Sequence, residues 1–140
     1  MFLVFQLLNP FLEEKGIKPI ETDLGEYIIQ LREEPPSHII APAIHVLKEG
    51  VATTFKETHT KLDPSRSLNE PRDLVDEARE ILRAKFLEAD VGITGAYFLI
   101  SETGSAIIVT NEGNGDLTQT LPRVHIVLAS LEKVVPSLED

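Results

Sequence analysis

The feature that most constrains the fold of this chain is a glycine-rich stretch from Asp90 to Gly115, DVGITGAYFLISETGSAIIVTNEGNG. Five glycines surround two strand-like runs, Tyr97–Ile100 and Ala106–Val109. Glycine tolerates positive φ and lets a second backbone or a ligand come close, so this spacing favours a shaped site. The strands would supply a rigid frame, and the turns between them would present hydrogen-bonding groups to a small ligand.

The turns of this stretch hold the candidate site residues. Glu102 is the one carboxylate in a glycine turn between two apolar strands, and it is either a catalytic nucleophile or general base, or a cap for backbone groups of the turn. Asn111–Gly115 follows a buried strand, where its N–H groups could hold a small carboxylate or a phosphate. The alternative there is an ordinary Asn-Gly turn. The predicted ligand-binding residues are Thr94, Gly95, Thr103, Gly104, Asn111, Glu112, Gly113 and Asn114.

The composition excludes several functions. The net charge of −10 over 140 residues argues against nonspecific nucleic-acid binding, because phosphate neutralisation needs Lys and Arg. The negative charge also disfavours binding to an anionic membrane surface. The apolar opening FLVFQLL is too short to span a bilayer and lacks the basic flank of a signal peptide. We therefore expect a cytoplasmic protein with one domain, residues 1–140.

The chain has no cysteine. Disulfides, thiolate catalysis and cysteine-ligated clusters are therefore excluded within these residues. No flavin or dinucleotide motif is recognisable either. We expect no redox chemistry from the chain by itself, and we predict no metal and no cofactor within it.

Helical and strand periodicities alternate along the chain, which implies a layered α/β domain. One segment has two interpretations: a helix from Ser37 with Pro42 inside it, at a cost of about 3 kcal/mol, or a short buried strand followed by a helix that starts at Pro42. We prefer the second. The predicted helices are 1–15, a short one after Thr22 or Asp23, 42–58 and one from Pro71. The predicted strands are 17–20, 38–41, 97–101, 105–110 and 124–129, the last covered on both faces.

Several motifs in one order carry a family resemblance. They are GITGAYFLISETGS from Gly92, TNEGNG from Thr110, LPRVHI, EKVVP and an upstream block from Glu21 to His45. Together these motifs resemble the LUD domain family over roughly Gly16 to Pro136, and most closely its iron–sulfur lactate-utilisation B branch. Motifs in register are far more specific than a single glycine pattern.

The resemblance implies a fold like that of the NagB/RpiA/CoA-transferase-like proteins, a layered sheet with flanking helices, here shortened at the amino end. It implies a role in oxidising L-lactate to pyruvate within an iron–sulfur electron-transfer complex of partner lactate-utilisation subunits. The iron–sulfur clusters would lie in a cysteine-rich region beyond these residues. An open sheet edge would also suit a homo-oligomer.

Two further functions stay open. One is a stand-alone module that binds a small carboxylate or phosphate without catalysis. The other is an acyl-transfer enzyme that uses Glu102, by analogy with fold relatives that transfer coenzyme A. The chain also departs from the family pattern: Asp116 replaces a basic residue, Tyr97 an asparagine and Arg123 a proline. The loss of a cation at Asp116 favours the module without catalysis.

The histidines do not predict a metal site. His38 and His45 fall on different predicted elements and His125 on an apolar strand, so no zinc geometry is fixed by their spacing. We expect hydrogen-bonded structural roles for them, and solvent exposure for His59. Ser37, like Ser101 and Ser105, lacks a nucleophile-elbow context, so serine hydrolase chemistry is not expected.

Overall fold

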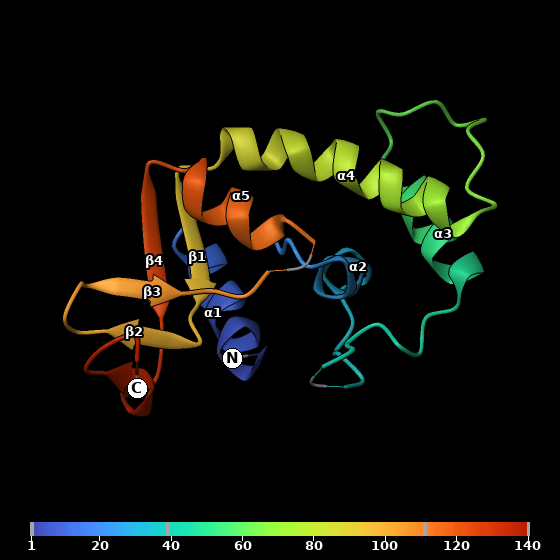
Figure 1. Ribbon diagram of the computed structural model, residues 1–140. Helices are drawn as coiled ribbons and strands as arrows, with labels where there is room; N and C mark the ends of the chain where they lie inside the picture. Colours follow the sequence, from blue (N-terminus) through green and yellow to red (C-terminus); the bar gives the residue numbers. More distant parts are fainter. Residues whose placement is uncertain (1, 39, 111, 140) are drawn as a thin grey trace. The chain divides into compact units, whose positions relative to one another are not determined.

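The chain folds into two compact units, one up to Arg83 and one from Ala84. The computed structural model describes residues 2–38, 40–110 and 112–139 (Figure 1). Helices occur together with a parallel and a mixed sheet, which confirms the α/β class. None of the described helices is both long and apolar enough to cross a membrane.

The first unit is helical. Its helices are α1 (Phe2–Glu14), α2 (Leu24–Arg32), α3 (Lys48–Thr58) and the start of α4 (Pro71–Glu88). The side chain of Asp23 caps α2 by accepting from the backbone N–H of Gly25 at 3.0 Å. The turn that follows α1 contains Gly16 (φ +77°), and the N–H of Ile17 closes this turn by donating to the carbonyl of Leu12. The sequence predicted a first helix over residues 1–15 and a second one after Thr22 or Asp23.

The core of this unit is formed by the apolar side chains of α2, α3 and α4 that are buried between these helices. Phe55 on α3 is fully buried, and Ile28 on α2 and Leu74 on α4 are each 7% exposed. The helix predicted from Pro71 buries an apolar stripe that includes Leu74, Ala78 and Leu82. Burying a side chain of this size contributes about 1.5–3 kcal/mol.

The predicted strands 17–20 and 38–41 are wrong for the residues that the structure describes, as is a helix start at Pro42. Side chains satisfy the backbone of the second segment locally. Ser37 donates its N–H to the carbonyl of Pro42 at 3.1 Å, its Oγ lies 3.2 Å from the same oxygen, and His38 Nδ1 accepts from the N–H of Ile40. Such local bonds compete with regular structure and leave a loop. Ile39 lies outside the described residues.

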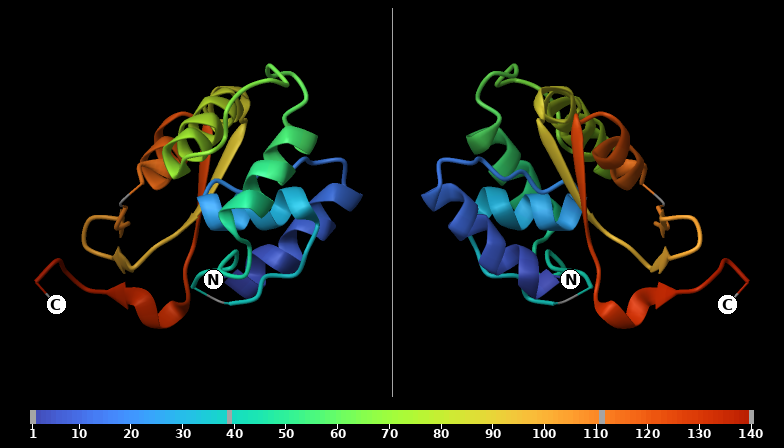
Figure 2. Two further views of the ribbon diagram at one scale, coloured as in Figure 1. Left: turned by 90° about the vertical axis from the view of Figure 1, so that its right-hand side faces the viewer. Right: turned by 90° about the vertical axis from the view of Figure 1, so that its left-hand side faces the viewer.

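The second unit contains a parallel strand pair linked through a helix. β1 (Val91–Gly95) pairs with β4 (Val124–Leu128), and α5 (Asn114–Thr120) packs on both (Figure 2). Gly92 makes that packing possible: a Cβ there would lie 1.9 Å from the carbonyl oxygen of Thr118. The sequence predicted neither β1 nor α5. The glycine spacing predicted that a second backbone or a ligand comes close, and at Gly92 the structure shows the first of these, the backbone of α5.

A small mixed sheet completes the unit. β2 (Phe98–Ile100) and β3 (Ser105–Ile107) form the predicted antiparallel hairpin, and β5 (Val134–Val135) pairs with β2 in parallel after a 3-10 turn, η1 (Leu131–Lys133). The hairpin strands are shorter than predicted. The predicted burial of the 124–129 strand on both faces is wrong, because Val124 is 51% and Ile126 44% exposed.

Candidate functional site

The structure distributes the predicted site residues over three places in the second unit. Thr94 and Gly95 end β1. Glu102, Thr103 and Gly104 form the turn between β2 and β3, and residues 112–114 lead into α5. Asn111 lies outside the described residues. Among the described residues, no hydrogen bond connects one of these groups with another, so a single pocket formed by all of them stays a prediction.

The turn that carries Glu102 is open to solvent. The backbone N–H of Glu102 donates to the carbonyl of Pro136 at 3.1 Å, and its side chain is exposed. Thr103 Oγ1 donates to Ser105 Oγ at 2.8 Å, and Gly104 takes the positive φ of +67° that the tight turn needs. These contacts favour the interpretation that this turn is structural. They leave the acyl-transfer role of Glu102 a prediction.

The predicted anion-binding loop forms the start of a helix. Gly113 (φ +80°) occupies the position before α5, and Asn114 Oδ1 accepts from the N–H of Gly115 at 2.9 Å. Asp116 stands in the first turn and accepts from Thr110 Oγ1 at 2.9 Å. Negative charge suits a helix N-terminus, so Asp116 supplies to α5 the charge that a bound anion would otherwise supply.

One polar pair in the second unit is suited to a small hydroxylated ligand. Thr94 Oγ1 on β1 lies 2.8 Å from Nε2 of His125 on β4, and the pair is partly buried. A hydroxyl beside an imidazole can donate and accept at the same point. The sequence placed Thr94 in the candidate site and His125 on a strand, but their contact depends on the register of two strands that lie 31 residues apart.

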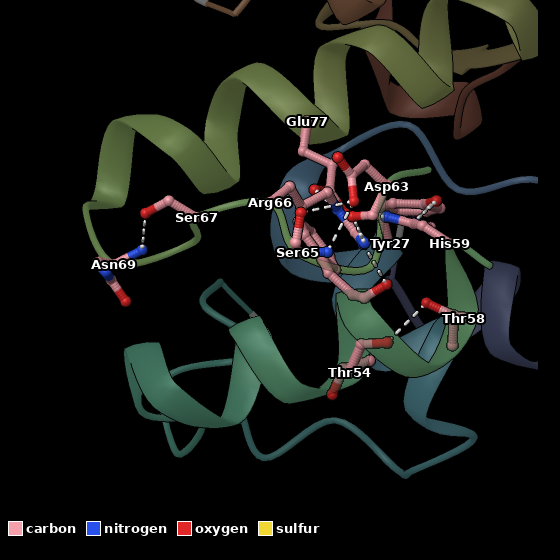
Figure 3. Close-up of polar contacts among 11 residues, drawn as sticks. Tyr27, Thr54, Thr58, His59, Asp63, Ser65, Arg66, Ser67, Asn69 and Glu77 are labelled. Carbon is pink, nitrogen blue, oxygen red and sulfur yellow. Dashed lines mark hydrogen bonds and ion pairs between the residues drawn. The ribbon is translucent and has the colours of Figure 1, made fainter. Parts of the chain in front are cut away.

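The first unit contains a buried polar network that sequence reasoning missed (Figure 3). His59 lies between two partners: Tyr27 Oη is 2.8 Å from Nε2, and Glu77 Oε1 is 2.7 Å from Nδ1. Arg66 completes the network with a two-pronged contact to Glu77, at 2.5 and 2.8 Å. His59 is 6% exposed, so the expectation of solvent exposure was wrong. The aromatic ring of Phe55, 4.6 Å from that of His59, excludes water on one side.

The electrostatics of this network keep Glu77 ionised. The Arg66 guanidinium holds the pKa of Glu77 below its ordinary value, against the effect of burial, and His59 adds to the lowering. Burial raises the pKa of Tyr27 to about 12, and the charge of Glu77 contributes, so Tyr27 keeps its proton at neutral pH. A bidentate arginine–carboxylate pair is a strong charge-assisted contact. The network therefore has the character of a structural element.

The remaining histidines of the first unit do not converge on a common point. His38 Nδ1 accepts from backbone N–H groups of its own loop, and His45 contacts Ser37 and Glu34. Among the described residues, no group of three or more His, Asp or Glu side chains is placed to hold a metal ion.

A pocket within the first unit is apolar. It has a volume of about 240 Å³, and its walls include Ile28, Val51 and Leu74. Lys48 is the charged residue among those that line it, and its Nζ already donates to the carbonyl of Asn69 at 2.7 Å. Such a pocket does not suit a small carboxylate. Its walls are apolar and the ammonium group of Lys48 already has a partner, so the charge of the ligand would be buried unpaired, which is costly.

The sequence pattern of the LUD domain matches residues 4–140. Over 95% of its length the chain is 52% identical to lactate utilization protein B of Bacillus subtilis and 50% identical to that of Bacillus velezensis. It is 47% identical to the protein of the same name from Geobacillus kaustophilus. The chain spans 27% of the length of these relatives. No solved structure matches it significantly.

Proposed function

Because the chain belongs to the LUD domain family, we propose that it serves in lactate utilisation, as the LUD portion of a protein of the B type. The observation that carries this proposal is the identity of about half of its residues with proteins of that name, across nearly the whole chain. The motif resemblance found in the sequence is confirmed by the same comparisons. The specific reaction and the partners go beyond them and belong to the proposal.

The reaction that we propose is the oxidation of L-lactate to pyruvate within an iron–sulfur electron-transfer complex. The residues of this chain do not fit a cluster, since iron–sulfur clusters are held by cysteine thiolates and the sequence has none. The clusters would be held by other parts of a longer protein or by partner lactate-utilisation subunits. When bound there, they would accept the electrons that leave lactate.

The part of the reaction that this chain can supply is binding. Within the second unit we assign the contact with lactate to Thr94 and His125, because their 2.8 Å pair offers both a donor and an acceptor in a partly buried place. The exposed carboxylate of Glu102 would repel the carboxylate of lactate, so it is the less suitable partner. The two hypotheses, catalytic complex and binding module without catalysis, share this contact.

A chimera tests the proposed function. This chain would replace the corresponding segment of the Bacillus subtilis protein, in a strain that lacks the native gene, with L-lactate as sole carbon source. We expect growth. A matched chimera with Gly92→Val should not grow, because the added Cβ meets the Thr118 carbonyl and disrupts the second unit.

Absence of growth would contradict the proposal if the chimera accumulates and the native gene restores growth. Lactate contact is tested separately by thermal denaturation of the chain in millimolar L-lactate. Thr94→Val should remove the stabilisation by lactate and leave the unfolding temperature without lactate nearly unchanged. Equal lactate-dependent shifts in both proteins would exclude Thr94 from the contact.

A further inference from the structure

A cluster of side chains suited to nucleophilic chemistry lies in the loop that follows α2, outside the site proposed for lactate. Ser37 Oγ is 2.8 Å from Nδ1 of His45, and Nε2 of His45 is 3.2 Å from Oε2 of Glu34. The order is hydroxyl, imidazole, carboxylate. We propose that Ser37, His45 and Glu34 form a nucleophilic site that accepts the acyl group of a small ester.

The carboxylate end of the cluster is fixed from behind. Arg32 Nη2 donates to Glu34 Oε1 at 2.6 Å, and Arg32 Nη1 donates to Thr54 Oγ1 on α3 at 2.9 Å. The hydrogen bond from Arg32 lowers the pKa of Glu34, and His45 lowers it further, so this group stays a carboxylate at neutral pH. The Glu34 oxygen therefore acts as an acceptor and selects the tautomer of His45 with its proton on Nε2.

That tautomer leaves Nδ1 of His45 as an acceptor, and the atom that faces it is the hydroxyl oxygen of Ser37. The carbonyl of Pro42 is a second acceptor for the same proton, at the longer distance of 3.2 Å. The backbone N–H of Ser37 is tied to Pro42 as well, at 3.1 Å, which holds the nucleophile in place. Activation of a hydroxyl requires this relation of nucleophile, base and orienting group, whatever the fold.

The site is open to substrate. Ser37 and His45 are exposed, and the side chains of His45 and Glu34 are 39% and 35% accessible. An open loop offers little binding energy, which limits the substrate to small, activated esters rather than a large ligand that needs a deep pocket. The buried network of His59 and Glu77 has no such access, because its hydroxyl, that of Tyr27, belongs to a residue that is 4% exposed.

The reaction balances without a co-reactant other than water. The Ser37 proton moves to Nδ1 of His45 as Oγ bonds to the ester carbonyl carbon. The carbon–alkoxide bond then breaks, and the alcohol leaves with the proton from His45. Water, deprotonated by the same nitrogen, next attacks the acyl carbon, releases the carboxylic acid and returns the proton to Ser37.

A fluorophosphonate probe tests the proposal on the full chain, because a serine oxygen activated in this way displaces the fluoride and keeps the label. We expect one label per chain, on the peptide that contains Ser37, and none after Ser37→Ala. His45→Gln should slow labelling by about 100-fold or more, as loss of a general base does. Glu34→Gln should slow it by a smaller factor, since it only orients that base.

Ser65→Ala is the matched control. Ser65 is an exposed serine whose Oγ bonds to a carboxylate, Asp63, at 2.8 Å without an intervening histidine. Labelling of the Ser65→Ala chain should equal that of the unaltered chain. An unlabelled native chain, a label on another residue, or equal rates with and without His45 would each overturn the proposal. If Ser37→Ala fails to fold, the peptide map of the native chain still decides.

Discussion

Among its described residues, the first unit contains two histidine–carboxylate pairs that differ mainly in burial. In the pair of His59 and Glu77 the side chains are 4% and 5% exposed, and in the pair of His45 and Glu34 they are 39% and 35% exposed. Each carboxylate also binds an arginine, Arg66 in the first case and Arg32 in the second. The same three residue types therefore occur once inside the unit and once on its surface.

Burial changes what such a trio can do. A buried charge must be paired, and removal of one partner leaves the others unsatisfied at a cost of about 3–5 kcal/mol. An exposed pair is screened by water and contributes about 0–1 kcal/mol to stability. The exposed pair is, however, the one that a substrate can reach. We infer that the buried histidine–carboxylate pair and its arginine stabilise the unit. The exposed pair of His45 and Glu34 is available for chemistry.

The largest effect that we expect is from Glu77→Ala. This change removes the carboxylate that buried His59 and half-buried Arg66 share, and we expect a loss of about 3–5 kcal/mol in the free energy of unfolding. Urea denaturation followed by circular dichroism measures it. Glu80→Ala, at an exposed position on the same helix, should stay within about 0.5 kcal/mol of the unaltered chain. Equal losses in the two variants would remove the distinction between the pairs.

Acid should weaken the buried pair. The pKa of Glu77 in the folded chain is lowered from 4.5, first by Arg66, so its contribution is present above pH 4.5 and is lost as the pH falls through the folded value. The difference in unfolding free energy between the unaltered chain and Glu77→Gln should therefore shrink below about pH 4.5. A difference that is constant from pH 7 to pH 3 would contradict this ionisation.

Stability depends on pH in the opposite direction through Glu26, a partly buried carboxylate. Burial, with Glu21 and Asp23 nearby, raises its pKa from 4.5 to about 7, so its favourable contribution is present below pH 4.5 and is lost as the pH rises through 7. Glu26→Gln should thus stabilise the chain at pH 8, by about 1 kcal/mol after allowance for solvent screening, and leave it unchanged at pH 4. Urea titrations at the two pH values measure this. Stabilisation that is equal at both would show that charge is not the cause.

The smallest effect on stability should come from Glu34→Gln. We expect almost no change in the free energy of unfolding, because the side chain is more than a third accessible and its ion pairs are screened by water. The same variant should slow fluorophosphonate labelling of Ser37. A large loss of stability from this substitution would show that the exposed pair of His45 and Glu34 is structural. The basis for assigning it a chemical role would then be lost.

Local signals in the sequence predicted much of the fold. Asp23 and Gly16 define helix ends by contacts within a few residues, and α4 shows its buried stripe as a simple period. The predictions that failed concern residues whose partners are distant in the sequence. His59 sits in a polar stretch, but its carboxylate lies 18 residues away and the hydroxyl of Tyr27 lies 32 away.

The candidate site shows the same limit. The glycine spacing predicted the close approach of a backbone or a ligand without deciding between them, and at Gly92 the close neighbour is the backbone of α5. Thr94 could be selected from the sequence, but its contact with His125 requires the pairing of β1 with β4. Ser37 was set aside because no nucleophile elbow surrounds it, and its partner His45 lies eight residues on, across a loop that was predicted to be a strand and a helix.

A pair of double-mutant cycles tests most directly the claim that burial divides the two trios. One cycle combines His59→Asn with Glu77→Gln, and the other combines His45→Asn with Glu34→Gln, with unfolding free energy as the readout. We predict a coupling of about 1.5 kcal/mol or more for the buried pair and a much smaller coupling for the exposed pair. Equal couplings, or a larger one for His45 and Glu34, would contradict it.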